Sequence, residues 1–157
     1  ATSPAGSTTP ADRMRIDSVG RVTMPYQPAF YVRRSVSGDG RSAGDITDWA
    51  VSGTGAHNTG NHFNTSNGRF VAPVAGKYLF TSMPGYKQSS IDFNVYFILN
   101  GSTLAEPVRF IGGLSSHSGG SGSIIINMIV NDYVTIYVGY THHANTTNNY
   151  FCGQLLG

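Results

Sequence analysis

Three aspartates and five histidines are the side chains of this sequence that could bind a metal ion. Asp39, Asp45 and Asp48 lie in or beside a glycine-rich stretch, and carboxylate oxygens on a flexible loop suit calcium. Their spacing is not that of a dedicated calcium loop, so aspartates in solvated turns are the simpler interpretation. The histidines also lack metal-ligand spacing. We therefore expect no cofactor, and calcium is the metal to test.

The remaining chemical motifs do not predict an enzyme. Gly38-x-Gly40-x-x-Ala43 fits a dinucleotide-binding pattern, but residues 44–50 are too short and too polar to supply the helix that must follow it. Cys152 is expected on a core-facing strand, where a thiol behaves as a small hydrophobe. We predict a non-enzymatic protein.

The composition predicts a β-sheet domain without nucleic-acid or membrane partners. Among 157 residues only two are lysine and one is glutamate, so strong helix formers are scarce, while 39% are hydrophobic and can form a core. The formal net charge is +2 and no basic block occurs, which argues against binding to nucleic acid. No apolar run approaches the ~18 residues of a membrane span, so no membrane insertion is expected.

Proline, glycine and alternating apolar residues divide the chain into an arm and a head. Residues 1–27 are rich in proline and small polar residues, and we expect an extended N-terminal arm or linker there. Residues 28–157 are expected to form the head domain. Asn100-Gly101 is a strong hairpin signal. Strands are predicted at 29–36, 46–51, 69–73, 76–83, 92–99, 103–110, 123–130, 133–141 and 150–156.

Two neighbouring strands are apolar on both faces, which predicts self-association. In residues 123–130, Ile125 and Ile129 lie opposite the apolar face that suits the core, and in residues 133–141 Tyr133 and Tyr137 do the same. Leaving several such side chains exposed is unfavourable, because each Å² of apolar surface in contact with water costs roughly 25 cal/mol. We predict that these four residues form a subunit interface. A sheet buried centrally within one subunit is the alternative.

The spacing of residues between Asn58 and Phe80 resembles that of a known family. The pattern comprises Asn58, Phe63, Phe70, Gly76, Tyr78 and Phe80. Together with the phrase from Phe63 to Gly76 and the last strand, Phe151 to Leu156, it is similar to the globular head of the complement q subcomponent, whose family shares its fold with tumour necrosis factor. The resemblance implies an all-β jelly-roll sandwich of two antiparallel sheets, assembled as a homotrimer, in a family that often binds calcium.

The sequence departs from this pattern at two positions. Ser52 stands where the family has a phenylalanine, so we expect Trp49 or Val51 to fill that core position. Ser82 replaces an aromatic residue two positions after Phe80. These changes affect packing at the edges more than the fold.

A second phrase, from Asp12 to Val22, is similar to one found in tail-fibre and other virion appendage proteins of bacteriophages. In those phage proteins this segment commonly precedes a terminal head domain. An ordinary amphipathic linker strand is the alternative. The resemblance implies a virion location, with the arm docking on other virion proteins; an extracellular location is the other choice.

These inferences predict a trimeric fibre tip or surface knob used for host attachment. The alternatives are a purely structural trimerisation cap or capsid decoration, and a secreted cytokine-like or lectin-like ligand. Loops would form the contact surface, with a host glycan or protein as partner and avidity from three copies. The candidate loop residues are Ser115, Ser116, His117, His142, His143, Asn145 and Asn148.

Overall fold

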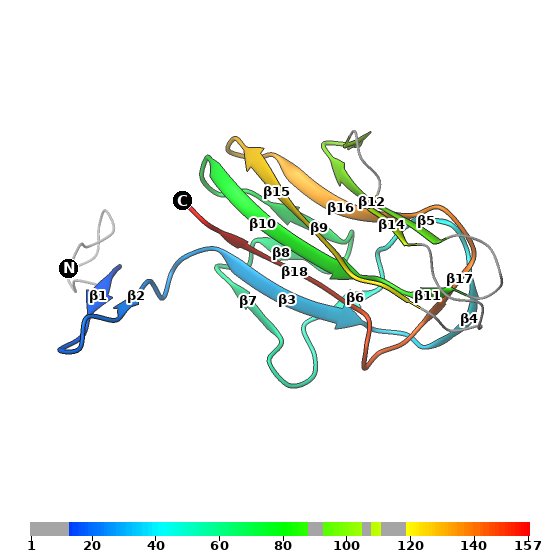
Figure 1. Ribbon diagram of the computed structural model, residues 1–157, viewed down its shortest axis with the longest axis horizontal. Coiled ribbons are helices and arrows are strands. Elements are labelled where there is room, and N and C mark those ends of the chain that lie inside the picture. The colour runs from blue at the N-terminus through cyan, green and yellow to red at the C-terminus, as the bar shows by residue number, and fades with distance from the viewer. Residues whose placement is uncertain (1–12, 88–92, 105–107, 111–118) are drawn as a thin grey trace.

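Two antiparallel β-sheets pack face to face and carry a small hairpin at the N-terminal end (Figure 1). The computed structural model describes residues 13–87, 93–104, 108–110 and 119–157. These residues contain strands and turns and no helix, and so no helix that could cross a membrane. The all-β jelly-roll architecture predicted from the sequence is confirmed.

The first sheet has the order β15-β10-β18-β3-β6, with β7 also paired to β3. Its strands are β15 (Gly122–Met128), β10 (Gly76–Met83), β18 (Tyr150–Leu155), β3 (Ala29–Arg34), β6 (Trp49–Ala50) and β7 (His57–Thr59). The second sheet has the order β13-β12-β16-β9-β8, with β14 paired to β12 and β5 to β16. Its strands are β13 (Ser102–Thr103), β12 (Phe93–Leu99), β16 (Tyr133–Val138), β9 (Arg69–Val71), β8 (Phe63–Asn64), β14 (Val108–Phe110) and β5 (Gly44–Asp45).

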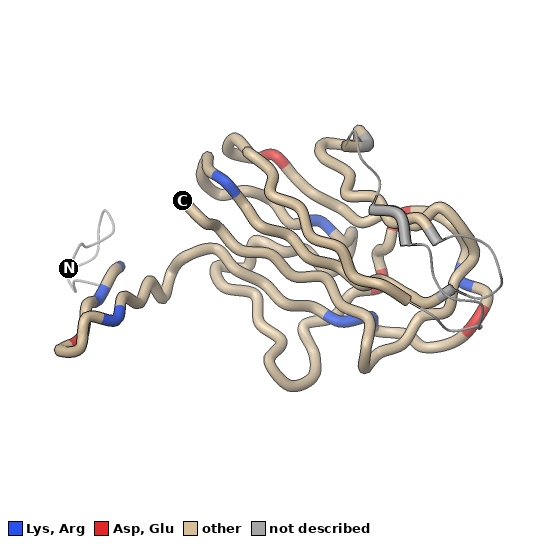
Figure 2. Tube along the Cα trace, viewed as in Figure 1, with Lys and Arg blue, Asp and Glu red and all other residues tan. Residues whose placement is uncertain are grey.

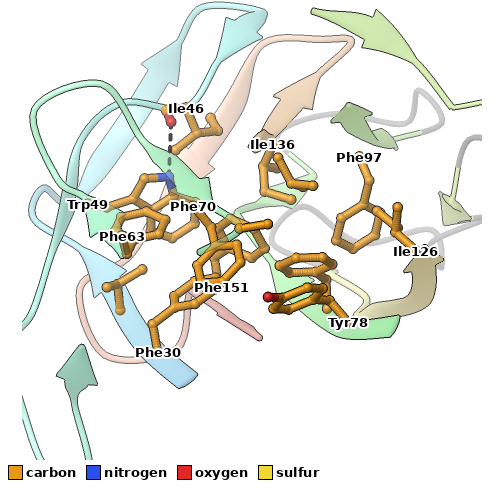
Figure 3. Close-up of a cluster of buried hydrophobic side chains, with 14 of the residues drawn as sticks. Phe30, Ile46, Trp49, Phe63, Phe70, Tyr78, Phe97, Ile126, Ile136 and Phe151 are labelled. Atoms are coloured by element: carbon orange, nitrogen blue, oxygen red, sulfur yellow. Dashed lines mark hydrogen bonds between the residues drawn. The ribbon is translucent and has the colours of Figure 1, made fainter. Parts of the chain in front are cut away.

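A cluster of aromatic rings fills the space between the sheets (Figure 3). Alternation along each strand turns these rings inward, and Phe30 stacks on Phe63 and Phe70 with ring centroids 4.7 Å and 5.0 Å apart. Gly153 lies under the cluster, where a Cβ atom would come within 2.5 Å of the Phe80 ring. The aromatic residues of the motif that carries the family resemblance, Phe63, Phe70, Tyr78 and Phe80, are therefore core residues.

Of the two residues expected to compensate for Ser52 in the core, Trp49 is buried and Val51 is not. The indole is 3% exposed and donates its N–H to the carbonyl of Ile46 at 2.9 Å, whereas Val51 is 44% exposed. The other departure, Ser82, is fully buried and donates its hydroxyl to the carbonyl of Tyr150 at 2.9 Å. The buried indole N–H of Trp49 and the buried hydroxyl of Ser82 are thus both hydrogen-bonded.

Left-handed residues close the predicted tight turns. Asn100 and Gly101 have φ of 51° and 80° and join β12 to β13, as the Asn-Gly signal predicted. Asn131, with φ of 71°, joins β15 to β16. The Asn100 and Asp132 side chains bond to each other at 2.7 Å, which ties these two turns together at one end of the sandwich.

The described part of the arm forms a hairpin and not the extended segment that was expected. β1 (Arg15–Ile16) pairs with β2 (Val22–Thr23), and the Asp17 carboxylate holds the turn through the backbone and side chain of Arg21. These hydrogen bonds lower the pKa of Asp17. The hairpin lies beside the sandwich and outside its layers (Figure 1).

A third, three-stranded sheet covers the opposite end of the sandwich. It has the order β11 (Tyr86–Lys87), β17 (His142–Ala144) and β4 (Gly38–Arg41). β4 contains the glycines of the dinucleotide-like pattern, and the helix that such a site needs does not follow them. Charged residues are few and widely spread along the trace (Figure 2).

Candidate functional site

Ile125 and Ile129 project from the edge strand of the first sheet and its following turn. Ile125 pairs with Leu79 on β10 and is 58% exposed, while Ile129 is 67% exposed. Ile124, Ile126 and Met128 turn the other way, toward the core. The two-sided apolar character predicted for this strand therefore leaves one apolar face uncovered in the single chain.

An apolar hollow of about 490 Å³ lies on the same outer face of the first sheet. Its floor comes from three adjacent strands, where Tyr31, Leu79 and Cys152 line it. Cys152 faces outward, so the prediction that it faces the core is wrong. Its neighbours Phe151 and Gly153 take the inward positions because they alternate with it along β18. Partial burial raises the pKa of the Cys152 thiol, which argues against a reactive thiolate.

Tyr133 and Tyr137 do not share a surface with Ile125 and Ile129. Both tyrosines lie on β16 in the second sheet, and the alternating Val134, Ile136 and Val138 face the core, so the tyrosines project from the opposite side of the sandwich. Within one subunit the four residues predicted for the interface therefore lie on two opposite faces, and a contact that uses all of them has to join the first sheet of one subunit to the second sheet of another.

His142 lies in a buried cluster with an ion pair and not in an exposed loop, so its place in the predicted loop surface is wrong. It belongs to β17, is 1% exposed, and its Nε2 lies 3.1 Å from Nη1 of Arg34. The arginine donates from Nη1 to the carbonyl of Pro84 at 2.6 Å and pairs with both carboxylate oxygens of Asp48, at 2.6 Å and 2.7 Å. Through these contacts Arg34 connects β3 to His142 on β17 and to Asp48, which lies just before β6.

The electrostatics of the cluster keep His142 neutral. Burial, reinforced by the positive charge of Arg34, lowers the pKa of His142 to about 4. An arginine N–H can only donate, so Nε2 accepts and the ring proton is on Nδ1, which lies 3.2 Å from the carbonyl of Tyr140. The cluster has a structural role: it holds β17 against the end of the first sheet.

The other loop candidates have different positions. His143 pairs with Asp39 at 2.8 Å, and the Asn145 side chain accepts backbone N–H bonds within its own turn. Asn148 is exposed. Ser115, Ser116 and His117 lie outside the described residues.

The three aspartates proposed for calcium do not come together. Asp48 pairs with Arg34, Asp39 with His143, and Asp45 extends from β5 alongside Tyr137. Within the described ranges, no group of three or more acidic, histidine or cysteine side chains could hold a metal ion.

Sequence reasoning missed Arg34 and Asp48 as a buried pair. Side chains alternate along β3, so Arg34 is on the same face as Phe30 and Val32, and this alternation was a signal that it points inward. The sequence gives no comparable signal for Asp48, because its partner is decided by how residues 42–48 fold back over the sheet end.

Comparison with known proteins matched one family model and many solved structures. The family model described as "C1q domain" matches residues 29–156. Among solved structures, the globular domain of the zebrafish complement 1qA protein superposes with a TM-score of 0.56 at 19% sequence identity, covering 83% of this chain and 98% of that one. Comparison with curated protein sequences gave no match. At this identity the structural match supports the fold alone.

Proposed function

Because this chain belongs to the C1q domain family through residues 29–156, we propose that it is a non-enzymatic, homotrimeric binding head that attaches a virion to its host. The family supports a binding role without catalysis. The virion setting rests on the resemblance of the arm to phage appendage proteins. It gives the head an external location, which a secreted ligand would share.

The observation that carries the proposal is the uncovered apolar face of the first sheet. Ile125 stands 58% exposed beside an apolar hollow of about 490 Å³, in a chain with few charges on its surface. Burying an isoleucine side chain stabilises an assembly by roughly 1.5–3 kcal/mol. In a closed trimer this contact is made three times, each between two different surfaces of neighbouring subunits.

The arm offers a second apolar surface for assembly. Cross-strand pairing places Ile16 and Val22 on one face of the hairpin, and by the same alternation Met14 and Met24 lie there too. All four are 48–60% exposed. An isolated two-stranded hairpin is marginal in water. This face therefore supports docking of the arm on a neighbouring subunit or on another virion protein.

Attachment through a trimer works by avidity. Three copies of a weak site, held at fixed separation, bind far more tightly than one. The exposed polar positions on the head include Asn148, and a host glycan or protein is the proposed partner. If the trimer binds no host surface, the purely structural cap is the role that remains.

The test compares two charge-introducing substitutions for adsorption to host cells. Ile125→Asp places a charge in the proposed contact and should dissociate the trimer and abolish adsorption, since an unpaired buried charge costs several kcal/mol. Thr65→Asp, in the exposed turn between β8 and β9, adds the same charge away from the first sheet. Equal adsorption by both variants and the unaltered protein contradicts the proposal.

A further inference from the structure

The outer face of the second sheet carries a groove that the trimer proposal does not use. It has a volume of about 540 Å³, within the range of small-molecule sites. Four tyrosines contribute to its lining, at positions 96, 133, 137 and 140, together with Arg69, Asp45 and Asn94. The groove lies on the opposite side of the sandwich from Ile125.

The order of side chains along β16 produces the groove. Tyr133, Thr135 and Tyr137 alternate with core residues along β16. The small side chain of Thr135 therefore lies between two large tyrosine rings on the outer face. Ile98 is paired with Thr135 on the neighbouring strand, and both are nearly buried, at 8% and 5% exposure. They form a low floor between tyrosine walls.

One wall is a row of three paired residues across the sheet. Tyr96 pairs with Tyr137, and Tyr137 pairs in turn with Asp45 on β5. The two rings pack edge to face with centroids 5.8 Å apart, which fixes their orientation. The row therefore presents fixed aromatic surface with a carboxylate at its end.

The other wall holds a stacked cation. The guanidinium of Arg69 lies over the Tyr133 ring, 4.1 Å from its centroid. Near the first wall, the side-chain oxygen of Asn94 is buried and accepts no hydrogen bond from the described residues. A buried acceptor without a donor is unfavourable, and a ligand hydroxyl or amide would satisfy it.

We infer that this groove binds a neutral carbohydrate. Tyrosine offers a large, rigid, amphipathic surface at low entropic cost, which suits the apolar face of a sugar ring. Asp45, Arg69 and Asn94 supply acceptors and donors for sugar hydroxyls. The two charged side chains have opposite signs, so the lining favours neutral ligands over polyanions. The inference rests on the proposed binding role and names a different surface from the loops.

The test is calorimetric titration of the full chain with tetrasaccharides of glucose, galactose, mannose and N-acetylglucosamine, and with heparin as a polyanionic probe. We expect one of the neutral sugars to bind. Tyr96→Ala and Tyr137→Ala should each weaken that binding about tenfold or more, as expected for an anchoring aromatic residue. Tyr137→Phe should weaken it less, because the ring stays. Tyr26→Ala, in the arm, is the matched control and should change nothing.

Arg69→Ala keeps the test valid if a tyrosine variant fails to fold, because Arg69 is exposed and its loss should weaken sugar binding without unfolding the sheet. Three results overturn the inference: no neutral sugar binds at about 10 mM; binding is unchanged in folded groove variants; or heparin alone binds. If the trimer still adsorbs to host cells in any of these cases, the carbohydrate assignment fails and the attachment proposal stands.

Discussion

Acidification should destabilise the head through His142 by an amount that can be worked out from the buried cluster. The pKa of His142 falls from the ordinary 6.5 to about 4 in the folded protein, through burial and the charge of Arg34. Above pH 6.5 the ring is neutral in both states and the cluster has its full stability. Between pH 6.5 and about 4 the unfolded chain binds a proton that the folded protein does not.

The free energy of unfolding should therefore fall as the pH is lowered through this window. Each pH unit contributes about 1.4 kcal/mol, so the loss attributable to His142 amounts to about 3 kcal/mol by pH 4. Below the folded pKa the ring is protonated in both states and this contribution stops changing. Such a loss is a large share of the total stability of a small domain.

Urea unfolding at a series of pH values from 8 to 4, at constant protein concentration, measures this dependence. Other groups titrate over the same range, so the decisive quantity is the difference between the unaltered protein and His142→Gln, in which the side chain can still accept from Arg34 but cannot titrate. If His142→Gln has the same pH dependence as the unaltered protein, His142 does not cause the loss of stability.

Three further predictions concern the core, the cluster and the arm. Gly153→Ala should lower stability by about 1–3 kcal/mol in thermal unfolding, because its Cβ would lie 2.5 Å from the Phe80 ring; an unchanged melting temperature would show that the core can shift. Arg34→Ala should cost about 3–5 kcal/mol in urea unfolding by leaving Asp48 and a carbonyl without their donor, and a loss below 1 kcal/mol would contradict this. Deleting residues 1–26 should leave the thermal stability of the head nearly unchanged while abolishing incorporation into particles; failure of the truncated chain to fold would make the arm part of the domain.

The strands of the head were predictable because their patterns are local. Residues 76–83 were predicted as a strand and form β10 with those bounds, and the Asn100-Gly101 turn follows from the conformational freedom of those two residues. The aromatic spacing identified the core because each ring alternates inward on a strand.

The functional surfaces were less predictable because they depend on which strands become neighbours. Alternation along β16 placed Tyr137 on an outer face. The sequence does not show that this face is opposite the one that carries Ile125. Nor does it show that Tyr96 and Asp45 lie next to Tyr137 in the sheet. His142 looked like a loop residue because its polar neighbours resemble a solvated loop. It is buried because β17 pairs with β4 and β11 and packs against Arg34 of β3.

The central claim, that the protein is a trimeric head, is tested most directly by sedimentation equilibrium of the full chain at micromolar concentration. We expect a single species of three times the 16.7 kDa chain mass, which Ile125→Asp converts to the monomer and Thr65→Asp leaves intact. A stable monomer of the unaltered protein under these conditions would contradict it.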